Sequence, residues 1–419
     1  MTEPHEASRS TERQTRVVLV TGKGGVGKTT SAAALGVAAA RDGLRTLLLS
    51  TDPAHSLGDV LGIDLPSGAT WDAAQPISDT EGHLFALAVD RHTDVRADWG
   101  AVREHLLLLL EGLDLDPVIA DELTTLPGAD ELAALLALAL AVDSGRWDLV
   151  VVDCAPSAET LRLLSLPEIL GWHLERLLPA QRRLLTTLRP AAAAATGLPL
   201  PGPEFVAVLM TWSGLLARCR EILTGPMASV RIVLTPERVV IAEARRLRSA
   251  FALHGYAVDE VIVNRLLPAG GDAWHTAWNR AQDEGIALIR ESFDGIPLSV
   301  TPHLAGEPIG VGALGDLVAA RTTIAGEAPR LLDPVRSAVP EVAREGEAFV
   351  LRQPVGLADA SDVRVHRRGD DLVLTVASER RILTLPSALR RCTVDNASVG
   401  HGMLTVRFST DEEVWPRGR

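Results

Sequence analysis

A glycine-rich segment near the N-terminus, GKGGVGKTT at residues 22–30, carries the residues with the clearest chemistry. It fits the phosphate-loop pattern G-x-x-x-x-G-K-[ST], with Gly22, Gly27, Lys28 and Thr29 at the fixed positions. Glycines let backbone N–H groups turn toward a phosphate chain, and the following helix adds the positive end of its dipole. The pattern predicts that Lys28 reaches the β- and γ-phosphates and that the Thr29 hydroxyl binds Mg²⁺. The expected nucleotide cradle is Gly24, Gly25, Val26, Gly27, Lys28, Thr29 and Thr30.

A second lysine, Lys23, stands directly after the first glycine of the loop. Lys23 and Lys28 are the only lysines in the chain, and the other 39 basic residues are arginine. A compact ammonium fits against phosphate oxygens where a planar guanidinium does not. This bias indicates that both lysines serve the phosphate site, although Lys23 alone would also be compatible with a solvated loop charge.

The elements that must position these residues read as alternating strands and helices. Strand-like apolar runs lead into the loop and recur after it, and two of them end beside an aspartate, Asp52 or Asp153. A carboxylate at the C-terminal end of such a strand is the usual holder of the Mg²⁺ shell, which we expect of Asp153. We therefore predict an α/β fold with a parallel sheet. The predicted strands cover residues 17–20, 45–50, 84–89, 147–154, 230–234 and 258–264.

Two long helical segments interrupt this alternation, at about 95–142 and 168–225, and we interpret them as insertions in one nucleotide-binding domain over residues 15–330. The first is richer in leucine than one core-facing stripe requires. Its surplus apolar surface either packs in the core or faces a client or a second subunit. The same two interpretations, core packing or an exposed contact surface, apply to the tryptophans of these segments, Trp99, Trp172 and Trp212.

The C-terminal part has a different sequence pattern. After a linker at 331–346, residues 347–412 read as short alternating strands with turn signals, which predicts a small all-β sandwich domain. Twelve acidic residues and twelve arginines lie beyond residue 339, so this part is neutral and separate from the acidic remainder. Short tails complete the chain at 1–14, read as disordered, and 413–419.

Composition narrows the class of protein. The net charge of −13 over 419 residues argues against a broad nucleic-acid or anionic-membrane surface. Three widely spaced cysteines, Cys154, Cys219 and Cys392, give no disulfide framework and fit a reducing cytoplasm. The N-terminus is polar and not a signal peptide, and the longest apolar run, at 132–142, is too short to span a bilayer. We expect a cytoplasmic protein with no nucleic-acid partner and no integral membrane segment.

Three motifs in register resemble the arsenical-pump and tail-anchored-protein-targeting ATPases, a branch of the dimerising P-loop ATPases with a deviant Walker A loop. They are GKGGVGKTT at 22–30, STDPAH at 50–55 and DCAPSAETLRLLSLP at 153–167. The similarity runs in order from about residue 16 to 325 and includes PLSVTPHLAGEPIGVGALGDL at 297–317. The C-terminal block resembles the small-heat-shock-like (alpha-crystallin-like) domain that some members append.

The resemblance implies a role for each residue that matches a motif. Lys23 matches the signature lysine that reaches the nucleotide of the other subunit in a homodimer, as an arginine finger would. Asp52 matches the switch I aspartate that orients or deprotonates the attacking water, and Asp153 the switch II aspartate beside Mg²⁺. Asn264 matches the residue that reads the adenine edge. The implied cofactors are ATP and Mg²⁺, and the implied catalytic residues are Asp52, Lys23 and Lys28.

The chain departs from the family in three places. The zinc-binding CxxC of the eukaryotic targeting members is missing from the segment after Asn264, so no zinc-bridged dimer is expected. The cysteine triad that binds arsenite in the pump has no counterpart, and we read Cys154 as a small buried residue. Ala158 and Glu159 stand where the family often has Gly-His, which bears on how hydrolysis is coupled to helix movement.

Together these patterns predict a Mg²⁺-dependent ATPase whose nucleotide-driven dimer closure controls an apolar client-binding surface. The client would be a transmembrane segment or a lipid-like ligand. Two alternatives stay open: an arsenite or metalloid efflux-pump ATPase, and a chaperone-like holdase that ATP switches with incidental hydrolysis. The partition-type ATPases would need a basic DNA-binding face or a terminal membrane helix, and the sequence shows neither.

Overall fold

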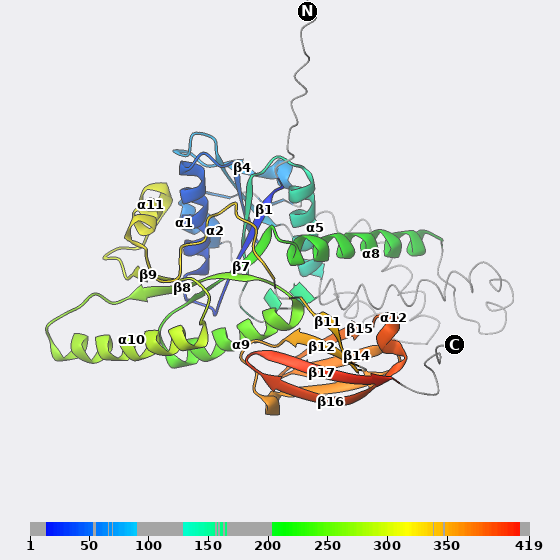
Figure 1. The fold of residues 1–419 in the computed structure, drawn as a ribbon. Helices are drawn as coiled ribbons and strands as arrows, with labels where there is room; N and C mark the ends of the chain where they lie inside the picture. Colours follow the sequence, from blue (N-terminus) through cyan, green and yellow to red (C-terminus); the bar gives the residue numbers. More distant parts are fainter. Residues whose placement is uncertain are drawn as a thin grey trace, which may run out of the picture.

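A computed structural model of the chain describes residues 14–52, 56–65, 67–68, 70–89, 129–155, 157, 160–161, 164–165, 203–337, 339–346 and 348–410. Within these residues the polypeptide forms a large mixed α/β region and an antiparallel β region, drawn at the bottom of Figure 1. No helix in this part of the chain is long and apolar enough to cross a bilayer.

Ten strands of the described chain make one central sheet in the order β10-β9-β8-β7-β1-β6-β2-β5-β3, with β4 paired to β5. The pairs from β5 to β9 are parallel, and β10 joins β9 antiparallel. Parallel strands are covered on both faces, so their sequences are continuous apolar runs. These runs are the pattern from which the strands were predicted. The strands are β1 (Arg16–Thr21), β2 (Thr46–Ser50), β3 (Ser67–Gly68), β4 (Gln75–Pro76), β5 (Leu84–Val89), β6 (Leu149–Asp153), β7 (Ala228–Leu234), β8 (Val258–Leu266), β9 (Leu298–Pro302) and β10 (Thr322–Ala325).

Successive residues of β1 supply the two faces of the sheet in turn. Val17 and Leu19 pack in one apolar core, whereas Val18 and Val20 pack in the other. Each fully buried side chain of this size contributes about 1.5–3 kcal/mol. The first core is covered by α5 (Ala129–Asp143), α8 (Pro203–Thr224), α9 (Arg238–His254) and α10 (Ala273–Ser292), and the second by α1 (Lys28–Arg41), α2 (Ser56–Leu61) and α11 (Gly310–Ala320). One 3₁₀ turn, η1 (Trp71–Ala73), lies beside β3.

The described parts of the two predicted helical insertions are α5 and α8. Leu135, Leu138 and Ala141 of α5 are buried in the first core, so this end of the leucine-rich segment is core-forming. Trp212 of α8 is partly buried against the same core. The rest of both insertions, including Trp99 and Trp172, lies outside the described residues.

The C-terminal region confirms the predicted all-β class. One sheet has the order β11-β12-β17-β16 and the other β13-β14-β15, and the two share a single apolar core. The strands are β11 (Glu341–Glu345), β12 (Ala348–Pro354), β13 (Val363–Arg368), β14 (Asp371–Val376), β15 (Glu379–Thr384), β16 (Cys392–Gly400) and β17 (Met403–Thr410), with η2 (Ala360–Asp362) and α12 (Ser387–Arg390) between them.

This region begins earlier than the sequence predicted. The segment Glu341–Glu345, placed in the linker from its charges, is strand β11, which pairs antiparallel with β12. Its side chains are exposed or half-buried, so it carries almost no apolar signal, and backbone pairing at the edge of the sheet makes it a strand.

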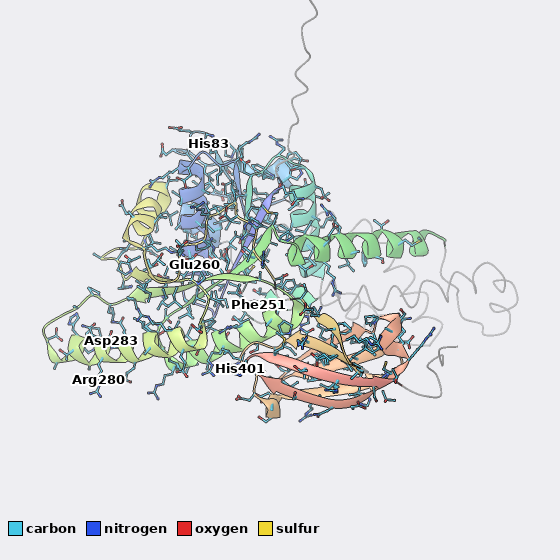
Figure 2. All side chains as sticks on the ribbon, viewed as in Figure 1. His83, Phe251, Glu260, Arg280, Asp283 and His401 are labelled. Atoms are coloured by element: carbon cyan, nitrogen blue, oxygen red, sulfur yellow. The ribbon has the colours of Figure 1, made fainter. Side chains whose placement is uncertain are left out.

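The C-terminal region packs on the end of α9. Leu253 of α9 belongs to the apolar core of the β region, and its carbonyl accepts hydrogen bonds from Gln353 (3.1 Å) and Arg381. The Leu357 amide donates to the Ser249 hydroxyl at 3.0 Å. Phe251 marks this end of α9 in Figure 2, next to the antiparallel sheets. Neutral composition could not reveal such a contact.

Candidate functional site

The phosphate loop lies between β1 and α1, where the backbone requires glycine. Gly25 and Gly27 have φ of 83° and 93°, and a side chain at Gly22 would place Cβ 2.1 Å from the Val233 carbonyl oxygen. Helix α1 starts directly at Lys28, and no side chain caps its first N–H groups. An uncapped helix start next to a glycine loop leaves N–H donors and the positive dipole end for an anion, which fits a phosphate chain.

The two lysines of the loop differ in their surroundings. Lys28, in the first turn of α1, is 7% exposed and belongs to the interior of the site. The Lys23 side chain is 37% exposed, and its Nζ lies 3.9 Å from Oε2 of Glu243 on α9. One ammonium is therefore enclosed with the cradle, and the other is accessible at its rim.

Asp153, the last residue of β6, is buried with half of its hydrogen-bonding capacity unused. Its Oδ2 accepts from the Ser50 hydroxyl at 3.4 Å, whereas Oδ1 has no partner in the described chain. Burial raises the pKa of this carboxyl to about 7, against the lowering effects of the Thr29 hydroxyl and the Lys28 ammonium. A buried unsatisfied carboxylate oxygen is costly, and a divalent cation or its water shell would satisfy it. Asp153 and Thr29 therefore fit a divalent metal.

Asp52 stands at the end of the neighbouring strand β2. Its backbone N–H donates to the Ser50 hydroxyl at 3.3 Å, and its Oδ2 accepts from Ser56 at 3.1 Å. Ser50 is in register with Asp153, and the Thr51 amide donates to the Asp153 carbonyl at 3.0 Å. The sheet thus brings the two predicted aspartates to one edge. Residues 53–55 lie outside the described residues.

Asn264, in β8, lies against the phosphate loop. Its Nδ2 donates to the Val26 carbonyl at 2.8 Å, and a Cβ on Gly27 would approach that nitrogen to 2.4 Å. Asn264 also lines a cavity of about 430 Å³ with Gly27, Thr30 and the segment 302–308. A cavity of this size beside the loop can receive a base, so the adenine-reading role of Asn264 remains a prediction that the geometry accommodates.

Sequence reasoning missed two groups at this site. The segment 302–308, which lies within the motif at 297–317 but had been given no role in the site, and Arg265 complete the wall of the cavity. Glu243 joins Lys23 to Ser157, whose hydroxyl donates to Glu243 Oε1 at 2.6 Å. Glu243 could not be singled out because it sits in a helix with many charges, and only the fold brings it to the loop. Ala158 and Glu159 of switch II lie outside the described residues.

The cysteines form no site. Cys154, Cys219 and Cys392 are each 1% exposed, and burial raises the pKa of the Cys219 thiol to about 12 and that of Cys154 further still. The prediction that Cys154 is a small buried residue is confirmed. In the described residues no group of three or more His, Cys, Asp or Glu could hold a metal ion.

Comparison with known proteins gives a consistent picture. A family profile described as anion-transporting ATPase matches residues 15–320, and one described as the HSP20-like domain found in ArsA matches 346–408. A Mycobacterium tuberculosis protein is 37% identical over 97% of this chain and 99% of its own length. A Chlorobaculum tepidum protein named as an arsenical pump-driving ATPase is 31% identical over 95% of this chain and 97% of its own. ATPase GET3B of Arabidopsis thaliana is 30% identical over 71% and 77% respectively.

Proposed function

The chain belongs to the ArsA family of anion-transporting ATPases and is an ATP hydrolase, and we propose that it works as a homodimer that closes around two nucleotides. In this proposal hydrolysis depends on Mg²⁺, and closure controls an apolar surface toward a client. The C-terminal HSP20-like domain is proposed as a chaperone-like accessory.

The observation that supports a shared site is the contrast between the two lysines. A lysine enclosed in the cradle, Lys28, serves its own nucleotide. A partly exposed lysine at the rim, Lys23, is placed to reach a partner. An added positive charge on the transferring phosphates is worth 10³–10⁵ in rate when a partner supplies it, and Lys23 is proposed for that task.

The carboxylates divide the remaining work. Thr29 and Asp153 would hold Mg²⁺, which when bound neutralises charge on the β- and γ-phosphates. Asp52, tied to Ser56 and next to Asp153, orients or deprotonates the attacking water. Asn264 and the cavity beside it accept the adenine.

The client surface is proposed on the helical insertions. The exposed large apolar side chains of the described chain include Leu140 of α5 and Met210 of α8, at 38% and 42%. Other residues of the same helices, such as Leu135 and Leu216, pack in the core. An apolar surface built on helices that cover the nucleotide sheet can respond when the two subunits close.

An efflux-pump ATPase is a second candidate, because relatives covering most of the chain are named as arsenical pump-driving ATPases. The buried, widely separated cysteines offer no thiolate cluster for a metalloid. Stimulation of ATP hydrolysis by arsenite or antimonite would favour this candidate over the client-binding one.

A holdase that ATP merely switches is a third candidate, since residues 346–408 match an HSP20-like domain. A Lys28→Ala variant separates the two ideas, because it should bind ATP poorly. If that variant still suppresses client aggregation fully, the holdase is favoured; if suppression disappears with nucleotide binding, the ATP-driven cycle is favoured.

Sedimentation velocity tests the shared site. With Mg²⁺ and a slowly hydrolysed ATP analogue, the wild type should shift from monomer to dimer or tighten an existing dimer, and Lys23→Ala should do so less. Nucleotide binding without any change in association in the wild type would contradict the proposal.

A further inference from the structure

Helix α9 touches the nucleotide site at one end and the β region at the other. In its first half, Glu243 accepts a hydrogen bond from Ser157 at 2.6 Å and lies 3.9 Å from the Lys23 ammonium. Lys23 belongs to the phosphate loop and Ser157 to the segment that follows Asp153. A single carboxylate therefore contacts both parts of the chain that respond to nucleotide in P-loop ATPases.

The same segment is attached a second time, at the far end of α9. The Tyr256 hydroxyl, just past the helix, donates to the Leu164 carbonyl. At 1.5 Å per residue the helix carries about 16 Å between Glu243 and its last turn. The segment after Asp153 is thus bonded to α9 and to the residue just past it at two separated points.

The last turns of α9 support the β region. Ser249 accepts from the Leu357 amide at 3.0 Å, Gln353 donates to the Leu253 carbonyl, and Leu253 is part of the β core. The contact is close, because a Cβ on Gly356 would lie 2.8 Å from Ser249 Cα. These contacts join the C-terminal end of α9 to the β region.

A cavity of about 690 Å³ lies between these three parts. It is lined by Ser157 and Leu161 from the segment after Asp153, by Ile241 of α9, and by Leu357 and Val376 of the β region, among others. Solid packing would resist relative movement, whereas a cavity leaves room for it.

We propose that Glu243 is a positioning residue, which holds Lys23 on its own subunit and links the departure of Lys23 to the position of α9 and the β region. The proposal rests on the shared-site function. When Lys23 moves to the partner's nucleotide, Glu243 contacts only Ser157. Helix α9 and the β region then move with the segment after Asp153.

The test uses the full-length chain and the variant Glu243→Gln, which keeps an acceptor for Ser157 but removes the charge that attracts Lys23. A partly exposed pair is weak, so the midpoint concentration for analogue-dependent dimerisation should fall only about two- to fivefold. Glu284→Gln, an exposed carboxylate on α10 paired with arginines, is the matched control and should leave the midpoint unchanged. In Lys23→Ala, the further change Glu243→Gln should have no effect on the midpoint.

Hydrogen–deuterium exchange of peptides covering 355–362 gives the second readout. An unchanged melting temperature of the variant shows that altered exchange does not come from loss of the fold. In the wild type the ATP analogue should change exchange here. In Glu243→Gln part of that change should be present without nucleotide.

Equal midpoints and equal exchange in Glu243→Gln and wild type would overturn the inference while leaving a dimerising wild type intact. A shifted midpoint without altered exchange would overturn the link to the β region. A wild type that does not respond to nucleotide in association would instead contradict the shared site.

Discussion

Two charged clusters lie in the same sheet, and they differ in how completely their charges are paired. Near the starts of β1 and β8, buried Arg16, Arg231, Asp259 and Glu260 form a network with distances of 3.1–3.4 Å. Arg321 and the hydroxyls of Ser229 and Ser299 complete it. At the strand ends, Asp153 keeps an unpartnered oxygen and Lys23 is partly exposed.

The difference separates charges that hold the fold from charges that await a ligand. The first cluster uses arginine, whose planar guanidinium serves several acceptors at once, and its buried carboxylates are satisfied within the chain. The second uses the only two lysines of the chain, leaves Oδ1 of Asp153 without a partner in the described residues, and holds Lys23 only in a partly exposed pair with Glu243. An unpartnered buried carboxylate oxygen next to the phosphate loop therefore supports the proposed nucleotide site better than charge alone does.

Removal of the enclosed lysine should have the largest effect. Lys28→Ala deletes the ammonium from the cradle, so kcat/KM for ATP should fall about 10⁴-fold. Thermal stability should change little, since the residue serves a ligand and not the fold. Steady-state hydrolysis with a melting curve checks both; a lost fold would place Lys28 with the structural cluster.

Substitution of Lys23 should lower turnover nearly as much as substitution of Lys28 does, but it should weaken ATP binding less. Lys23→Arg keeps the charge and alters its shape, so kcat should drop about 10³-fold while most ATP affinity remains. Nucleotide titration and turnover on the same sample separate the two. Normal turnover would refute the role of Lys23 at the partner's nucleotide.

The structural cluster should show the reverse pattern. Glu260→Gln leaves Arg231 and Arg321 short of a charge in a buried place and should lower the free energy of unfolding by about 3–5 kcal/mol. Turnover per folded molecule should be kept. Glu284→Gln, whose carboxylate is 56% exposed, should change stability by less than about 0.5 kcal/mol in denaturant titration. A large loss of turnover at constant stability would erase the distinction.

A gradual, pH-dependent effect belongs to Asp153. Because burial raises its pKa from 3.8 to about 7, the folded nucleotide-free state binds a proton more tightly than the unfolded chain does. The carboxylate therefore costs stability as pH rises from about 4 to 7, by about 1.4 kcal/mol per pH unit at most. Asp153→Asn should be more stable than wild type near pH 8 and lose that advantage toward pH 4. Parallel pH-dependence in both proteins would contradict an ionised, unsatisfied Asp153.

Much of the fold was predictable because its signals are local. The runs before the loop and around Leu47 and Val151 are apolar on both faces, as a parallel strand that is covered on both sides requires. Arg16 and Glu260 were invisible as core residues, since a charged residue in a strand suggests an edge and its partners come from strands far away in sequence. Strand β11 was not predicted for a related reason: backbone pairing, not side-chain burial, makes it a strand.

At the site, the predictions that follow from strand ends and loop glycines agree with the geometry. Asp52 and Asp153 meet at one edge because adjacent parallel strands end there. Glu243 and the cavity wall at 302–308 depend on how α9 and the segment after β9 pack, and no local pattern encodes that. The roles of the site residues remain predictions until kinetics test them.

The shared site is tested most directly by mixing two inactive variants. Lys23→Ala keeps its own cradle but cannot serve a partner, and Lys28→Ala retains Lys23 for a partner but not its own cradle. In random mixed dimers one site in two is complete, so an equimolar mixture should recover up to about a quarter of wild-type hydrolysis. Activity that stays at the level of the separate variants under conditions where mixed dimers form would contradict the claim that each nucleotide is hydrolysed by both subunits.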